Sequence, residues 1–90
     1  MKKSIITVVG HDAVGIIAKV CVYLAEQQIN ITSISQTIVD GYFNMMMIAD
    51  MNASTRSFDQ VNEELRALGD EIGVIIRIQR EEIFDSMHRI

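Results

Sequence analysis

The segment from Ile5 to Ile16 reads IITVVGHDAVGI, and it decides how the rest of the chain is placed. Its first five residues are β-branched, and the run stops at Gly10. Two polar residues and a second glycine, Gly15, come soon afterwards, and an apolar helical pattern begins there. This order predicts a buried strand, a tight turn and the first turn of a helix. Because a helix start carries unpaired N–H groups and glycine leaves space beside the backbone, a small polar group could approach the chain at this turn.

The length and composition indicate a single domain that spans residues 1–90. Hydrophobic residues make up 49% of the chain and proline is absent, which excludes a disordered or proline-rich chain. Twelve acidic residues against eight basic residues give a net charge of −4. A nucleic-acid partner is therefore not expected, because the neutralisation of phosphates requires clustered lysine and arginine.

Membrane, metal and catalytic roles find no support in the sequence. No apolar stretch approaches the roughly twenty residues of a membrane span, and Lys2 and Lys3 are not followed by a signal-peptide core. Cys21 is the only cysteine, so neither a metal site nor a cofactor is expected. No Ser/His/Asp, Cys/His or paired-carboxylate set can be assembled, so no catalytic residue is expected. We expect a cytoplasmic protein without enzymatic activity.

The first half of the chain predicts a central strand, a largely apolar helix and an edge strand. Residues 4–9 are almost continuously apolar, which indicates burial on both faces of a sheet. Residues 13–27 form the predicted helix, with Asp12 as its N-cap. Its apolar arc is much wider than the about 100° of a surface helix, so part of it must meet the sheet, the other helix or a partner chain. Residues 30–39 mix polar and apolar side chains, which fits the edge of a sheet.

The second half continues with a hairpin, a second helix and a final strand. Asp40 and Gly41 predict a type I′ turn into a central strand over residues 42–50. Ser57 and Gln60 have capping-box spacing, and the helix that begins there is expected to end at Gly73. A strand over residues 74–79 and a short C-terminal helix within residues 79–90 complete the chain, and that last helix needs the body or a second chain to dock on.

The order β-α-β-β-α-β predicts an α+β, ferredoxin-like fold, with a four-stranded antiparallel sheet in strand order 4-1-3-2 and both helices on one face. This order places the two most apolar strands in the centre and the polar second strand at an edge. We expect the run Met45-Met46-Met47 to be strand core. One side of the third strand carries Phe43, Met45, Met47 and Ala49. The sequence does not show whether this side faces the helices or the opposite face of the sheet. A bare apolar face or an open edge favours a homodimer.

Two segments, Gly10 to Ile16 and Ile29 to Ile31, resemble the corresponding parts of ACT domains. The tail sequence IFDSM, residues 83–87, further resembles small stand-alone bacterial ACT proteins, which are similar to the glycine-cleavage-system transcriptional repressor. The resemblance implies a domain that binds amino acids or other small ligands at a dimer interface and regulates an enzyme. We expect no enzyme to be attached to this chain, so the resemblance does not say which protein it would regulate.

The resemblance also implies which residues bind the ligand. The turn would supply backbone amides and a close-approach glycine through His11, Asp12, Ala13, Val14, Gly15 and Ile16. Asn30 and Ile31 would line the same site from the neighbouring subunit. The carboxylate of an amino acid suits a helix N-terminus, and its ammonium group needs an acceptor such as the side chain of Asp12 or Asn30.

Each of these residues also has a purely structural interpretation. Gly15 can serve close packing of the helix on the sheet, and Asp12 can act only as a helix cap. His11 can be a solvated turn residue, and Asn30 a turn residue with unusual backbone angles. If these interpretations hold, the chain is a ligand-free protein–protein interaction module or a transcriptional co-regulator.

Overall fold

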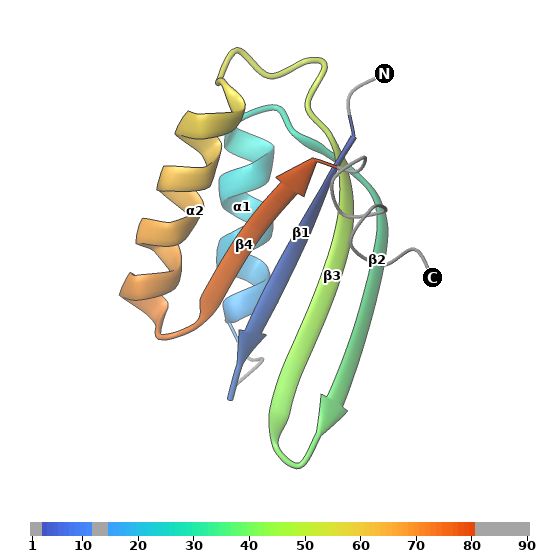
Figure 1. Cartoon of the computed structure of the whole chain (residues 1–90), viewed down its shortest axis with the longest axis vertical. Coiled ribbons are helices and arrows are strands. Elements are labelled where there is room, and N and C mark those ends of the chain that lie inside the picture. The colour runs from blue at the N-terminus through green and yellow to red at the C-terminus, as the bar shows by residue number, and fades with distance from the viewer. Residues whose placement is uncertain (1–2, 12–14, 81–90) are drawn as a thin grey trace.

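The computed structural model describes residues 3–11 and 15–80, and these form one sheet covered by two helices (Figure 1). The elements follow the order β1 (Lys3–Gly10), α1 (Ile16–Glu26), β2 (Asn30–Val39), β3 (Tyr42–Asp50), α2 (Phe58–Ile72) and β4 (Ile75–Arg80). The sheet has four strands in the order β2-β3-β1-β4. The predicted ferredoxin-like topology is therefore confirmed, whereas the predicted C-terminal helix lies outside the described residues.

All neighbouring strands are antiparallel, and β1 lies between β3 and β4. In the turn from β2 to β3, Asp40 and Gly41 have φ angles of 51° and 79°, as a type I′ turn requires. The predicted edge position of the polar second strand is confirmed, since β2 pairs only with β3 among the described residues. Figure 1 shows β2 at the edge of the sheet that is farther from the two helices.

The core lies between the sheet and the helices, and β3 contributes one complete face to it. Phe43, Met45, Met47 and Ala49 are buried there, which settles the orientation that the sequence left open. Met46 points to the opposite face and is 39% exposed. The expectation that all three methionines are core is therefore wrong for Met46, because neighbouring residues of a strand face opposite ways.

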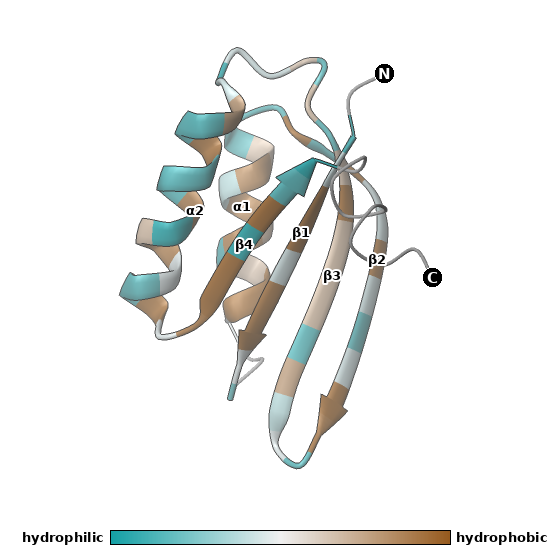
Figure 2. Ribbon diagram, viewed as in Figure 1, coloured by the Kyte–Doolittle hydropathy of each residue, from teal (hydrophilic) through white to brown (hydrophobic). Residues whose placement is uncertain are grey.

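Helix α2 has both of its predicted ends. The side chain of Ser57 accepts a hydrogen bond from the backbone of Gln60, and the Gln60 side chain accepts one from the backbone of Ser57. Gly73 ends the helix with a left-handed φ of 78°. Polar residues cover the outer face of α2, as the teal bands in Figure 2 show, and the apolar face packs on the sheet.

Helix α1 begins later than the sequence predicts, at Ile16 instead of residue 13. Its N-cap is Gly15, which has a φ of 83°, so the assignment of Asp12 as the N-cap is wrong. The left-handed conformation at Gly15 interrupts the helical path, and the helix can start only after it. At its other end, α1 is tied to α2 by the Tyr23 hydroxyl, which donates to Glu64 at 2.6 Å.

Candidate ligand site at the start of helix α1

The two glycines of the β1–α1 turn have different surroundings. A Cβ atom at Gly10 would collide with the side chain of Val74, so the space beside Gly10 is filled by the protein itself. A Cβ atom at Gly15 would meet no atom of the described residues within 4 Å. Gly10 is therefore a packing glycine, whereas the alternative that Gly15 serves close packing on the sheet is wrong. Open space in the turn lies beside Gly15.

The N-terminus of α1 adjoins this open space. Gly15 has no side chain with which to cap the helix, and the first turn of α1 contains no acidic residue. The first backbone N–H groups of a helix have no partner within the helix and carry its partial positive charge. The Ile16 side chain, however, is buried in the core, so only the backbone of Ile16 can take part in a site. Such a corner suits a small anionic group.

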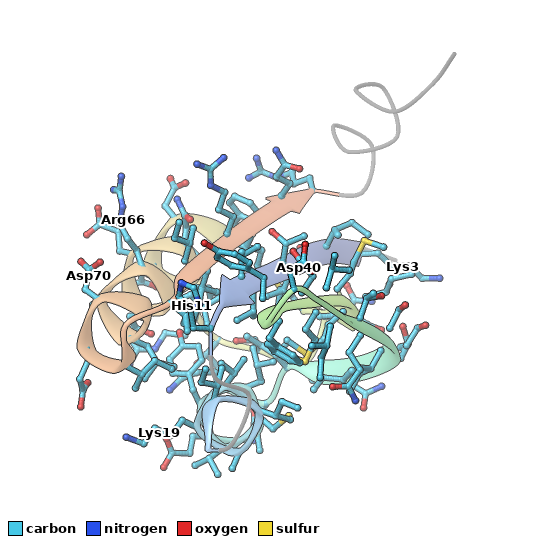
Figure 3. The ribbon with its side chains drawn as sticks, turned by 90° about the horizontal axis from the view of Figure 1, so that it is seen from below. Lys3, His11, Lys19, Asp40, Arg66 and Asp70 are labelled. Atoms are coloured by element: carbon cyan, nitrogen blue, oxygen red, sulfur yellow. The ribbon has the colours of Figure 1, made fainter. Side chains whose placement is uncertain are left out.

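His11 lies beside Tyr42, a residue that the sequence does not indicate for this corner. Its ring centroid is 4.3 Å from that of Tyr42, with the two ring planes at 39°. Gly10 is opposite Phe43 in the sheet register, so the next position along β1 comes beside Tyr42 at the start of β3. His11 is exposed, as a turn residue should be, but the ring contact holds it at this end of the sheet (Figure 3). The register between β1 and β3 brings the two rings together, and the sequence gives no local signal for that register.

The other predicted site residues do not join His11 and Gly15 within one chain. Asn30 is opposite Asp50, which is opposite Lys3 at the start of β1. This position is seven residues from Gly10, or about 23 Å along the strand. Asn30 and Ile31 thus lie at the far end of the sheet from the turn. Asp12, Ala13 and Val14 lie outside the described residues.

The described residues contain no cluster of three or more histidine, cysteine, aspartate or glutamate side chains that could hold a metal ion. Among the helices of this described part, none is long and apolar enough to cross a membrane. The burial of the Tyr23 hydroxyl, together with its hydrogen bond to Glu64, raises the pKa of Tyr23 well above its ordinary value. Tyr23 belongs to the contact between the two helices and lies outside the candidate site.

Comparisons with known proteins show which family the chain resembles over almost its whole length. Residues 3–79 match the family model described as an ACT domain. A UPF0237 protein of Bifidobacterium longum is 60% identical over 90 residues, which are 100% of both chains. The structure of an ACT domain protein from Streptococcus pneumoniae is similar with a TM-score of 0.83 and 42% identity, over 93% of this chain and 94% of that one.

A second solved structure shares the fold at lower sequence identity. It is a putative glycine cleavage system transcriptional repressor, with a TM-score of 0.79 and 21% identity over 88% of this chain and 46% of that one. The family model covers most of the chain, and relatives match it over its full length. The protein therefore belongs to the ACT domain family.

Proposed function

We propose that this protein is a non-catalytic regulatory module that binds a small molecule of the amino-acid class and acts as a homodimer. One observation carries the proposal: the uncapped start of α1 adjoins open space at Gly15, where the chain takes a left-handed conformation. A small carboxylate can approach these N–H groups without meeting a side chain at Gly15. The membership of the ACT family supports the same class of ligand.

The proposed site consists of the turn residues His11, Asp12, Ala13, Val14 and Gly15 and the backbone of Ile16. The ligand carboxylate lies against the start of α1, where the helix dipole favours negative charge. The ligand ammonium group needs an acceptor, and Asp12 from the turn or Asn30 from β2 can supply one. Since Asn30 of the same chain is at the far end of the sheet, the proposal needs a second subunit.

A two-fold dimer through β2 would bring the missing residues to the turn. The final residues of β2 lie at the same end of the sheet as Gly10, because Ile38 and Gly10 are both opposite Phe43. Antiparallel pairing of two β2 strands reverses the direction of the second strand. The partner's Asn30 and the partner's Ile31 would then lie at the end of the sheet that carries His11 and Gly15.

The charge of the two sheet edges favours β2 for this dimer. β2 has ten residues, almost all exposed, and none of them is charged. Ile34 and Ile38 are 46% and 69% exposed on the side of the sheet that faces the helix layer. β4, at the opposite edge, carries Arg77 and Arg80. Charged side chains oppose pairing between edges, whereas a long uncharged edge invites it.

A thermal-shift screen of the twenty amino acids and common metabolites tests the proposal. A ligand at a hundred times its dissociation constant stabilises the folded state by about 2.7 kcal/mol, which raises the Tm of a domain of this size by about 10 °C. Asn30→Ala should reduce the shift, whereas Asn44→Ala, at an exposed position of β3, should leave it unchanged. If no compound changes the Tm while the protein captures a specific protein partner, the ligand-free interaction module or transcriptional co-regulator replaces this proposal.

A further inference from the structure

Helix α2 and strand β4 enclose a groove of about 330 Å³ at the edge of the sheet opposite β2. From α2 it is lined by Asn62, Arg66 and Asp70, which are spaced by four residues and so share one face of the helix. Figure 3 shows Arg66 and Asp70 on the same side of α2. From the β4 side the groove is lined by Val74, Ile75, Ile76 and Arg77. Ile76 faces the core, so Ile75 and Arg77 lie on the face of the sheet opposite the helices.

The close contact between α2 and β4 explains why the helix stands beside the strand edge. A Cβ atom at Gly69 would lie 2.7 Å from the Val74 carbonyl oxygen and 3.3 Å from the Ile76 side chain. The absence of a side chain at Gly69 therefore lets α2 approach the beginning of β4. The face of α2 that carries Arg66 then runs along the groove.

The groove is basic in an acidic protein. The whole chain has a net charge of −4. The groove, in contrast, has a net charge of +1, because its lining contains two positive residues, Arg66 and Arg77, and one negative residue, Asp70. Within the described residues, neither Arg66 nor Arg77 forms an ion pair, since the ion pair found there joins Arg56 and Glu64. Arg80 differs from them, because its guanidinium lies over the Phe58 ring at 4.2 Å. Two guanidinium groups are thus free to meet carboxylates.

The backbone of β4 adds a second kind of binding group. β4 pairs with β1 on one side, and no described residue pairs with its other side. Alternate residues of Ile75–Arg80 therefore direct N–H and C=O groups outward, where a further strand can pair with them. An extended segment bound in this way would have every second side chain on the α2 side of the sheet.

We propose that the groove between α2 and β4 binds an extended acidic segment of a partner protein, which adds a fifth strand to the sheet. Backbone hydrogen bonds to β4 hold the segment. A carboxylate on its helix side pairs with Arg66, and a carboxylate on its other side pairs with Arg77. The same arginines oppose the pairing of β4 with a second copy of itself, because like charges would then face each other. Asp70 repels a carboxylate at its own end of the groove. It therefore helps to fix the register of the bound segment along β4. This site is independent of the start of α1.

Two synthetic peptides test the proposal with the full-length ¹⁵N-labelled protein. The first is an acetylated and amidated octapeptide of the repeating sequence Val-Val-Glu-Glu, which places glutamate on both sides of a bound strand. The second has lysine in place of glutamate. In an NMR titration at low salt, the glutamate peptide should shift the amide signals of Ile75–Arg80 and the side-chain Nε signals of Arg66 and Arg77. Binding should weaken as salt is added, and the lysine peptide should give no shift.

Charge reversal makes the test specific to the groove. Arg66→Glu and Arg77→Glu should each weaken the glutamate peptide at least about tenfold, since a favourable charge pair becomes a repulsive one. The double variant should bind the lysine peptide instead, which also shows that the groove remains folded. Lys19→Glu, at an exposed position of α1, is the matched control and should leave the affinity unchanged.

Four results would overturn the proposal. Equal binding of both peptides would show that charge does not select the segment, and shifts confined to β2 would place the pairing at the other edge. Shifts of the same β4 signals by free glutamate at the same concentration would identify a site for small anions instead of a strand. Absence of any shift with the glutamate peptide would also contradict the proposal.

Discussion

Gly69 shows how one residue controls the distance between two elements. Its missing side chain lets α2 approach within contact of the Val74 carbonyl oxygen. A backbone carbonyl cannot move aside as a flexible side chain can. The position of α2, and with it the face that borders the β4 groove, therefore depends on this glycine.

Gly69→Ala should lower the free energy of unfolding by about 1–2 kcal/mol, because overpacking a close contact outweighs the better helix propensity of alanine. Urea denaturation monitored by circular dichroism measures the change. Glu63→Ala, at an exposed position of the same helix, is the control and should change the stability by less than about 0.5 kcal/mol. A stabilised Gly69→Ala variant would show that the contact can relax.

Tyr23 should make the stability depend on pH in the alkaline range. Burial of its hydroxyl and its hydrogen bond to Glu64 raise its pKa in the folded state above the ordinary value of about 10. Because the folded protein holds this proton more tightly than the unfolded chain, the contribution is fully present below about pH 10 and is lost as the pH rises above it. Tyr23→Phe should cost about 1 kcal/mol at pH 8. Urea titrations should show this difference shrinking above about pH 10, and a pH-independent difference would contradict the assignment.

At the scale of the element, α1 and α2 begin in opposite ways. The first turn of α2 is satisfied by the reciprocal hydrogen bonds of Ser57 and Gln60. The first turn of α1 follows a left-handed glycine that has no side chain to offer. A helix that completes its own cap has less need of an external partner. This contrast supports the start of α1, and not that of α2, as the place for a ligand.

Ser57→Ala should destabilise the protein by about 1 kcal/mol, since it removes the acceptor for the Gln60 amide and breaks the capping box. Chemical denaturation gives the value directly. Thr55→Ala, two residues earlier in the exposed connection, serves as the comparison and should be near neutral. Equal effects of the two substitutions would argue that the cap contributes nothing beyond loop packing.

At the scale of the whole molecule, the sheet has one uncharged edge and one edge with arginines. The uncharged edge, β2, is the proposed dimer contact, and the arginine edge, β4, is the proposed site for a partner strand. Helix α1 also keeps an exposed apolar residue, Val22, at 57% exposure. The apolar arc of α1 therefore exceeds what this single chain covers.

Ile34→Lys should prevent dimerisation. Ile34 lies near the middle of β2, so a two-fold pairing of β2 strands would bring the two substituted lysines close together at the dimer axis. Ile34 is already half-exposed, so the substitution should leave the fold intact. Sedimentation velocity reads the oligomeric state, and Ile75→Lys on β4 is the matched control that should remain dimeric. A dimer that survives Ile34→Lys would exclude pairing through the centre of β2.

The sequence predicted the elements far better than the local geometry between them. The mixed polar and apolar side chains of β2, the glycine at Gly73 and the capping box of Ser57 are local signals, and the structure confirms what each of them predicts. The start of α1 was placed too early, because no local pattern reveals that Gly15 adopts a left-handed φ. Contacts that join distant segments, such as the His11–Tyr42 ring contact, depend on sheet register and become visible only in the folded chain.

An NMR titration of the ¹⁵N-labelled protein with the amino acid that gives the largest thermal shift tests the central claim most directly. The account predicts that the amide signals of Gly15 and Ile16 at the start of α1 and those of Asn30 and Ile31 on β2 shift together, with one dissociation constant. Saturable shifts that leave the start of α1 unchanged, or no shift with any of the twenty amino acids, would contradict it.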